Sequence, residues 1–200
     1  MIGSLIIVGF FILGAVLAYL GFIPEFLIGS HLSFYALCAL MFCVGFSIGN
    51  DTKTLRSFRN LNPRLLLLPL MTIAGTLLGT FLISFVLPHR SPSDCMAVGS
   101  GFAYYSLSSI IISDTKGAEL GVIALMSNII RELSALMLAP FFVKYFGRLA
   151  PISVGGATSM DTTLPIITKY SGKEFIVTSI FHGLVVDFSV IFLVTLFCSF

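Results

Sequence analysis

The chain has 200 residues and a net charge of +2; 57% of its residues are hydrophobic and only 10% are charged. Because soluble domains carry about 25% charged residues, this composition excludes an ordinary soluble domain and indicates an all-α integral membrane protein. Three dispersed histidines, and the lack of HExxH, GxSxG and Walker motifs, argue against a metal centre or an enzyme. We therefore expect no cofactor, no metal and no nucleic-acid partner.

Membrane-spanning helices need about 20 mostly apolar residues. The first candidate has no Lys or Arg before it and is too long for the apolar region of a signal peptide, so we expect a membrane anchor there. The four cysteines lie in apolar segments without metal-type spacing, which favours packing roles. About five transmembrane helices are predicted, at roughly 2–23, 32–50, 65–87, 118–143 and 175–200.

Basic residues predict the topology. The densest basic cluster lies at 51–64, and the positive-inside rule places it in the cytoplasm. Two later basic pairs, at 144–148 and 169–173, are expected on the same side. This assignment leaves two stretches, about 95–113 and 150–168, that must each enter and leave on one side. We expect re-entrant or broken segments, the first dipping from outside and the second from inside.

The two leftover stretches resemble each other. At an offset of 56 residues, Val98-Gly99 falls on Val154-Gly155 and Ile110-Ile111 falls on Ile166-Ile167. One interpretation is chance, because so few matches among apolar residues arise without a repeat. The other interpretation is an inverted repeat, which is a common plan of secondary transporters. The chain is then one membrane transport domain, with scaffold and interface spans in 1–94 and an inverted-repeat core in 95–200.

Asp161 is the most informative residue of the second segment, VGGATSMDTTLPII. An acid at bilayer depth costs about 2.5–3.5 kcal/mol on insertion scales and indicates a functional site. Non-helical backbone at that depth must line a cavity or be buried in protein. The alternative is that Asp161 only caps a short helix in an interfacial loop. Its candidate binding neighbours are Gly155, Gly156, Thr158, Ser159 and Thr162.

Other polar residues are predicted at the same depth. Asn128, Arg131 and Glu132 share one helix face, which either lines the cavity or forms a structural clamp in which Arg131 and Glu132 pair with each other or with neighbours. His182 and Asp187, in the last span, are candidates for proton transfer, or His182 only hydrogen-bonds across a helix interface. In the first segment the candidates are Gly99, Gly101 and Ser106, with Tyr104 and Tyr105 as contacts or interfacial anchors.

Two other classes of function remain open at this point. Ser159, Asp161 and His182 supply the residue types of an intramembrane hydrolase, although no spacing singles them out. A structural assembly subunit is the second class, but it leaves the glycine-rich polar segments and the ionisable residues at membrane depth unexplained.

Three blocks of sequence carry a resemblance to a known family: YYSLSSIIISDTKGAELGVIALMSNIIRE, APISVGGATSMDTTLPIITKYSG and IFHGLVVDFS. Over roughly residues 30–200 the chain resembles the bacterial lysine exporter family LysO. The resemblance implies export of L-lysine and toxic lysine analogues across the inner membrane, and importance of the acid at Asp161. Family members are longer and carry a further N-terminal unit with another acid. We therefore expect a homodimer, or a small membrane protein that supplies this unit.

Charge constrains the expected mechanism. A cytoplasm negative by about 100 mV holds each positive charge inward by about 2.3 kcal/mol, so export of cationic lysine needs an inward cation. Our hypothesis is proton antiport, in which Asp161 alternates between a proton and the lysine ammonium and Glu132 assists. Backbone N–H groups of Gly99–Gly101 and Gly155–Gly156 would meet the lysine carboxylate. The alternatives are Na⁺-coupled transport of another small solute and the assembly subunit.

Overall fold

The structure is a computed structural model that describes residues 67–87 and 89–200, with isolated positions between 9 and 46. Every regular element in this part is helical, which confirms the predicted all-α class. The expected spans at 2–23 and 32–50 and the basic connection at 51–64 fall outside the described residues, apart from those isolated positions.

Two described helices are long and apolar enough to cross a membrane: α8, Ala118–Phe146, and the stretch Lys173–Cys198. The latter comprises a short 3-10 turn, η3 (Lys173–Phe175), and α11 (Ile176–Cys198). A third apolar helix, α5, covers Leu68–Ser84, which is shorter than the predicted span at 65–87. These helices coincide with the expected third, fourth and fifth spans, of which the fourth and fifth are long enough to cross a membrane.

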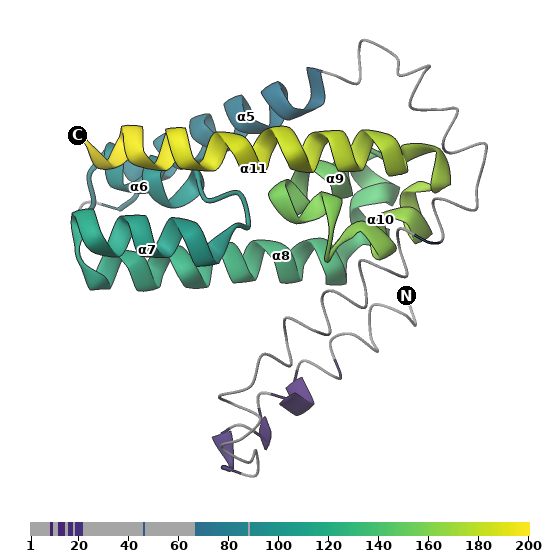
Figure 1. Cartoon of the computed structure of the whole chain (residues 1–200), viewed down its shortest axis with the longest axis horizontal. Coiled ribbons are helices and arrows are strands. Elements are labelled where there is room, and N and C mark those ends of the chain that lie inside the picture. Colours follow the sequence, from purple (N-terminus) through teal and green to yellow (C-terminus); the bar gives the residue numbers. More distant parts are fainter. Residues whose placement is uncertain are drawn as a thin grey trace.

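The two leftover stretches form broken segments, as predicted. The first consists of α6 (Pro92–Gly99) and α7 (Tyr105–Lys116), and the second of α9 (Ala150–Gly155), η2 (Gly156–Met160) and α10 (Leu164–Ser171). In Figure 1, α6 and α7 lie at the C-terminal end of α11, whereas α9 and α10 lie toward its N-terminal end. This placement is compatible with entry from opposite sides; the inverted repeat itself stays a prediction.

Local sequence explains where the first segment begins and breaks. Ser91 and Asp94 form a capping box: Ser91 Oγ accepts the Asp94 N–H at 3.1 Å, and Pro92 follows the cap. After α6 ends, Phe102 and Ala103 adopt φ of 44° and 71°, in the left-handed region. Non-glycine residues rarely adopt this conformation, and it prevents the helix from continuing. We call residues 99–103 tip 1.

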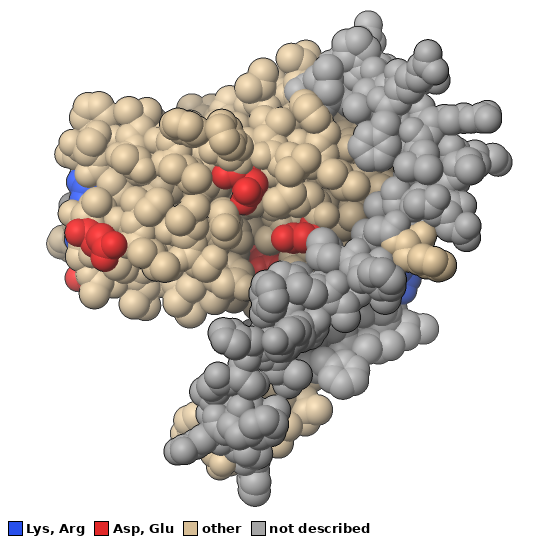
Figure 2. Space-filling model, viewed as in Figure 1, with Lys and Arg blue, Asp and Glu red and all other residues tan. Residues whose placement is uncertain are grey.

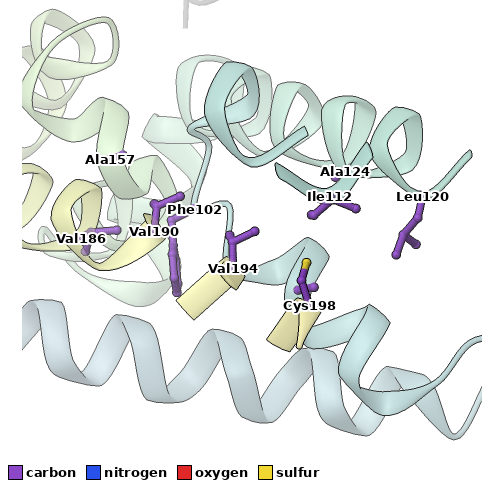
Figure 3. Packing of buried hydrophobic residues seen from close by; sticks show 10 residues of the cluster. Phe102, Ile112, Leu120, Ala124, Ala157, Val186, Val190, Val194 and Cys198 are labelled. Carbon is purple, nitrogen blue, oxygen red and sulfur yellow. The ribbon is translucent and has the colours of Figure 1, made fainter. Parts of the chain in front are cut away.

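A stripe of small apolar side chains on α11 forms the core. Val186, Val190, Val194 and Cys198 recur every four residues and therefore share one face of the helix. Figure 3 shows this stripe running past Phe102, which is fully buried between α11 and the remaining helices. The opposite face of α11 exposes large hydrophobic side chains, which suits contact with lipid.

Candidate functional site

The tips of the two broken segments meet at a backbone hydrogen bond. The Ala157 N–H donates to the Phe102 carbonyl at 2.9 Å. Gly156 makes this approach possible, because its φ is +60° and a Cβ there would lie 2.3 Å from the Phe102 oxygen. We call residues 156–163 tip 2. Backbone that leaves helical geometry is thus satisfied by protein, as membrane depth requires.

Asn128 of α8 holds tip 1. Its Oδ1 accepts the Ala103 N–H at 2.8 Å, and its Nδ2 donates to the Ala124 carbonyl at 2.9 Å. Gly101 lies directly against the amide, since a Cβ there would be 2.2 Å from Asn128 Nδ2. The side chain is buried, and it fixes the strained backbone around Phe102 and Ala103 with a bond that water cannot replace.

Arg131 lies one turn further along α8 and contacts both segments. Its Nε donates to the Val154 carbonyl at 2.9 Å and its Nη2 to the Ser153 carbonyl at 3.0 Å, at the C-terminal end of α9. A cation is favourable there because of the partial negative charge of a helix C-terminus. The guanidinium also lies 5.3 Å from the ring centroid of Phe102. Of the predicted structural clamp, the Arg131–Glu132 pair is not formed, because the two side chains bind different groups, whereas Arg131 does bind neighbouring groups.

Glu132 contacts tip 2 through a threonine. The Thr162 hydroxyl donates to Glu132 Oε1 at 2.5 Å and lies 3.3 Å from Asp161 Oδ1, which accepts the Thr162 N–H. Two carboxylates from separate elements therefore share one hydroxyl. The side chain of Asp161 does not cap α10, whose N-cap is Thr163 and has no side-chain cap bond.

Asp187 and Tyr105 complete an acidic cluster with Asp161 and Glu132. Asp187, on α11, lies near enough to Asp161 for their charges to interact, and Tyr105 lies near enough to Glu132 and Asp161 for the same. The three carboxylates are partly buried. In Figure 2 acidic side chains appear at the middle of the visible face, whereas basic ones appear only at its edges. The described residues contain no group of three or more His, Cys, Asp and Glu that could hold a metal ion.

His182 is fully buried and links three elements. Its Nδ1 lies 3.0 Å from Ser159 Oγ and its Nε2 lies 3.0 Å from Thr72 Oγ1 on α5. Ser159 Oγ donates to the Ser179 carbonyl, so it accepts from Nδ1–H, and Nε2 accepts the Thr72 hydroxyl. The Ser159–His182 contact resembles a hydrolase dyad, but Thr72 replaces the carboxylate of a triad. The bond across helices, which the sequence left as an alternative, is what the structure contains.

The other candidate residues have mainly packing roles in this structure. A Cβ at Gly99 would lie 2.4 Å from Thr80 Cγ2, and one at Gly155 would lie 2.8 Å from Thr163 Oγ1. Thr158 Oγ1 donates to the Gly155 carbonyl, and Ser106 is exposed in the first turn of α7.

The expected role of the glycine N–H groups is corrected by the structure. Gly101 N–H donates to the Val98 carbonyl, and Gly156 N–H donates to the Ile152 carbonyl. The reason is that Gly101 and Gly156 follow the C-terminal ends of α6 and α9, where free carbonyl groups accept their N–H groups. These N–H groups are therefore already bonded and do not offer a site for a carboxylate.

Two contacts of the site involve residues that the sequence did not single out. The Phe102 ring packs against the guanidinium of Arg131. Thr72, which lies on α5, forms a hydrogen bond with His182. Only the glycines that precede Phe102, Gly99 and Gly101, signalled a close backbone approach. Thr72 gives no signal, because threonine is common in apolar helices.

An all-helical chain with an apolar exterior and two broken segments that meet around polar side chains is typical of a secondary membrane transporter. The comparison with known proteins agrees with this class. The chain belongs to the lysine exporter LysO family, whose family model matches residues 8–198. The resemblance found in the sequence is thus confirmed.

Two relatives illustrate the relationship. The chain is 32% identical over 165 residues to the lysine exporter LysO of Escherichia coli K12, covering 82% of this chain and 54% of that protein. It therefore spans about half the length of that relative. It is 34% identical over 172 residues to a putative lysine exporter of Haemophilus influenzae, covering 86% of each chain. No solved structure matches.

Proposed function

We propose that this chain exports L-lysine, and toxic analogues of lysine, across the bacterial inner membrane as a multi-pass secondary transporter. The names of the two relatives support lysine as the solute. Basic residues at 144–148 and 169–173, near the α9–α10 end of the described part, support placing that end in the cytoplasm.

The observation that carries the coupling proposal is the shared hydroxyl of Thr162 between Asp161 and Glu132. Two carboxylates this close repel each other when both are ionised. Binding of a cation to one of them relieves the repulsion. A proton is the simplest inward cation, and Asp161 is the coupling carboxylate, assisted by Glu132. Asp187 is a third acidic group near this pair.

Energetics favour such coupling. Lysine carries a net charge of +1, and a potential of about 100 mV opposes its export by about 2.3 kcal/mol. Exchange for one proton makes the cycle electroneutral, so the pH gradient drives export. Exchange for Na⁺ has the same charge balance.

The decisive experiment uses a lysine-export-deficient strain grown on a toxic lysine analogue. Expression of the chain restores growth, and Asp161→Asn abolishes the rescue because the amide cannot take up a cation. Asp114→Asn is the matched control, since Asp114 is an exposed acid near the end of α7. Full rescue by Asp161→Asn overturns the coupling role. Failure of the unmodified chain, even with a small membrane protein encoded beside it, overturns lysine export and favours an assembly subunit.

Proteoliposomes distinguish the coupling ions. With lysine inside, an inward proton gradient is expected to accelerate lysine efflux at constant Na⁺, and a Na⁺ gradient at constant pH is expected to have no effect. The reverse result assigns coupling to Na⁺ and contradicts the proton as the exchanged cation.

A further inference from the structure

Two cavities lie on the same pair of helices, α5 and α8. The first, of about 520 Å³, is lined by Thr72, Thr76 and Arg131, together with the end of α9. The second, of about 420 Å³, is lined by Thr80 and Ser127, together with α6. We call them the α9-side and the α6-side cavity. Neither is lined by Asp161, Glu132 or Asp187.

One helical turn separates the cavities on each helix. Along α5, Thr76 lines the α9-side cavity and Thr80 lines the α6-side cavity; along α8, Arg131 and Ser127 do the same. Residues four apart are one turn apart on the same face of a helix. The two cavities therefore follow one seam between α5 and α8, in series.

Tip 1 contacts the walls of both cavities. Gly99 packs against Thr80, and Phe102, which is fully buried, lies against the guanidinium of Arg131. Asn128, between Ser127 and Arg131 on α8, holds the tip by the Ala103 N–H. The barrier is therefore one turn thick and consists of Phe102, Arg131 and the backbone that Asn128 holds.

The barrier contains strained backbone. Phe102 and Ala103 have positive φ, a conformation that costs roughly 1–2 kcal/mol per residue for L side chains. Such strain persists only where surrounding contacts impose it, and it occurs at switch regions and ligand clamps. Here the imposing contacts are single hydrogen bonds to Asn128 and to Ala157, from opposite sides of the tip.

We propose that the α5–α8 seam is the solute pathway of this transporter and that Phe102 and Arg131 form its central gate. Each cavity is the vestibule of one side of the membrane. This inference rests on the proposed function, and it separates the solute pathway from the acidic cluster. Asp161 then affects the solute through movement of tip 2, which binds tip 1 at Ala157 and Phe102.

The chemistry of the gate selects a solute that carries a carboxylate. Arg131 Nη1 lies 3.4 Å from Thr76 Oγ1, and both residues line the α9-side cavity. A guanidinium binds a carboxylate with two parallel hydrogen bonds. A carboxylate of the solute would compete with the α9 carbonyls and with the Phe102 ring for Arg131, which loosens the barrier.

Cysteine accessibility tests the pathway. In a chain whose native cysteines are replaced, Gly75→Cys lines the α9-side cavity and Ser127→Cys the α6-side cavity, and both positions are exposed. A membrane-impermeant thiol reagent is expected to modify Gly75→Cys from one side of the membrane and Ser127→Cys from the other. Leu78→Cys and Met126→Cys are the controls, because these exposed residues of the same helices line neither cavity.

A second arm tests the gate. Phe102→Ala is expected to make Gly75→Cys reactive from both sides, whereas Phe102→Leu keeps the one-sided pattern. Lysine is expected to slow the modification of Gly75→Cys, while cadaverine, which lacks the carboxylate, does not. Arg131→Gln should raise the lysine concentration for half-protection by at least about tenfold, the factor that corresponds to 1.4 kcal/mol. Arg131→Lys should raise it less, because the positive charge stays.

The outcomes separate this inference from the proposed substrate. Modification of both cavity cysteines from the same side, or of the control cysteines at equal rates, overturns the pathway. Protection by cadaverine as strong as by lysine overturns the role of Arg131. One-sided labelling on opposite sides without protection by lysine supports the pathway and overturns lysine as the solute.

Discussion

At the scale of single residues, one face of α8 organises the site. Asn128 binds tip 1, and Glu132 binds tip 2. Arg131 contacts both broken segments. The i, i+3, i+4 spacing of these residues predicted a shared face, and the structure shows that each side chain satisfies a different partner. Arg131 is bound by carbonyls and a ring, so its charge remains available to an anion that enters the cavity.

Gly156 is the residue on which the contact between the tips depends. Gly156→Ala is expected to abolish transport and to destabilise the protein by more than about 2 kcal/mol. Positive φ alone costs an alanine roughly 1–2 kcal/mol, and the new methyl group would lie 2.3 Å from the Phe102 carbonyl oxygen. Rescue of growth on the lysine analogue and thermal unfolding in mild detergent measure the two effects.

Gly147→Ala is the matched control for this substitution. Gly147 also has a positive φ, of +89°, but nothing lies within 4 Å of the added Cβ. The variant therefore carries the conformational strain without the clash, and it should keep transport with a smaller loss of stability. Equal losses in the two variants would contradict a specific role for the tip contact.

At the scale of elements, the short helix α6 depends on its local cap. α6 has only eight residues, which is too short to be stable alone, and its capping box is reinforced by an ion pair between Asp94 and Lys116 at 3.4 Å. This ion pair joins the start of α6 to the end of α7. It therefore holds the two ends of the first broken segment together, away from tip 1.

The pH dependence of this closure follows from Asp94. Burial raises the pKa of Asp94, but hydrogen bonds from Ser91 and the charge of Lys116 outweigh it and hold the pKa below the usual 3.8. The carboxylate therefore stabilises the folded state fully above about pH 3.8, and this contribution disappears as pH falls through the lower folded pKa. Asp94→Asn is expected to lower the unfolding temperature at neutral pH.

The same comparison at acid pH provides the check. The difference in unfolding temperature between the unmodified chain and Asp94→Asn should shrink below about pH 3.8. Asp114→Asn, at an exposed acid of α7, should show no such convergence. A difference that stays constant with pH would mean that Asp94 acts through packing and not through its charge.

At the scale of the whole molecule, the acidic cluster is only partly covered by the described residues. Glu132, Asp161 and Asp187 keep partial exposure beside large apolar side chains such as Phe188 and Phe192. Charged groups that face lipid are costly. We expect a second copy of the chain, or a small membrane protein, to cover this face and to bury the carboxylates within the assembly.

Native mass measurement in mild detergent tests this expectation. A dimer, or a complex with a second small membrane protein, is the expected result. Phe188→Lys should weaken the assembly, since it places a charge beside the covered cluster, whereas Leu78→Lys on α5 should not. A monodisperse monomer of 21.6 kDa that binds and transports lysine would contradict the prediction.

The sequence by itself determined the membrane class and the broken segments, and it predicted a role for Asp161, because each follows from local quantities. Apolar run length, glycine and proline content, and the cost of an acid at membrane depth are properties of a segment and need no partner. The family blocks, GATSMD among them, are local as well, and the LysO family was recognised from them.

Only the tertiary structure decided which groups meet. The separation of Arg131 from Glu132, the Phe102 ring on the guanidinium and the Thr72–His182 bond join residues up to 110 positions apart. Such contacts depend on how α5, α8 and the tips pack, and side-chain direction on a helix determines only a face, not a partner. The same reason explains the glycine N–H groups: whether a glycine begins or ends a helix depends on the neighbour against which it packs.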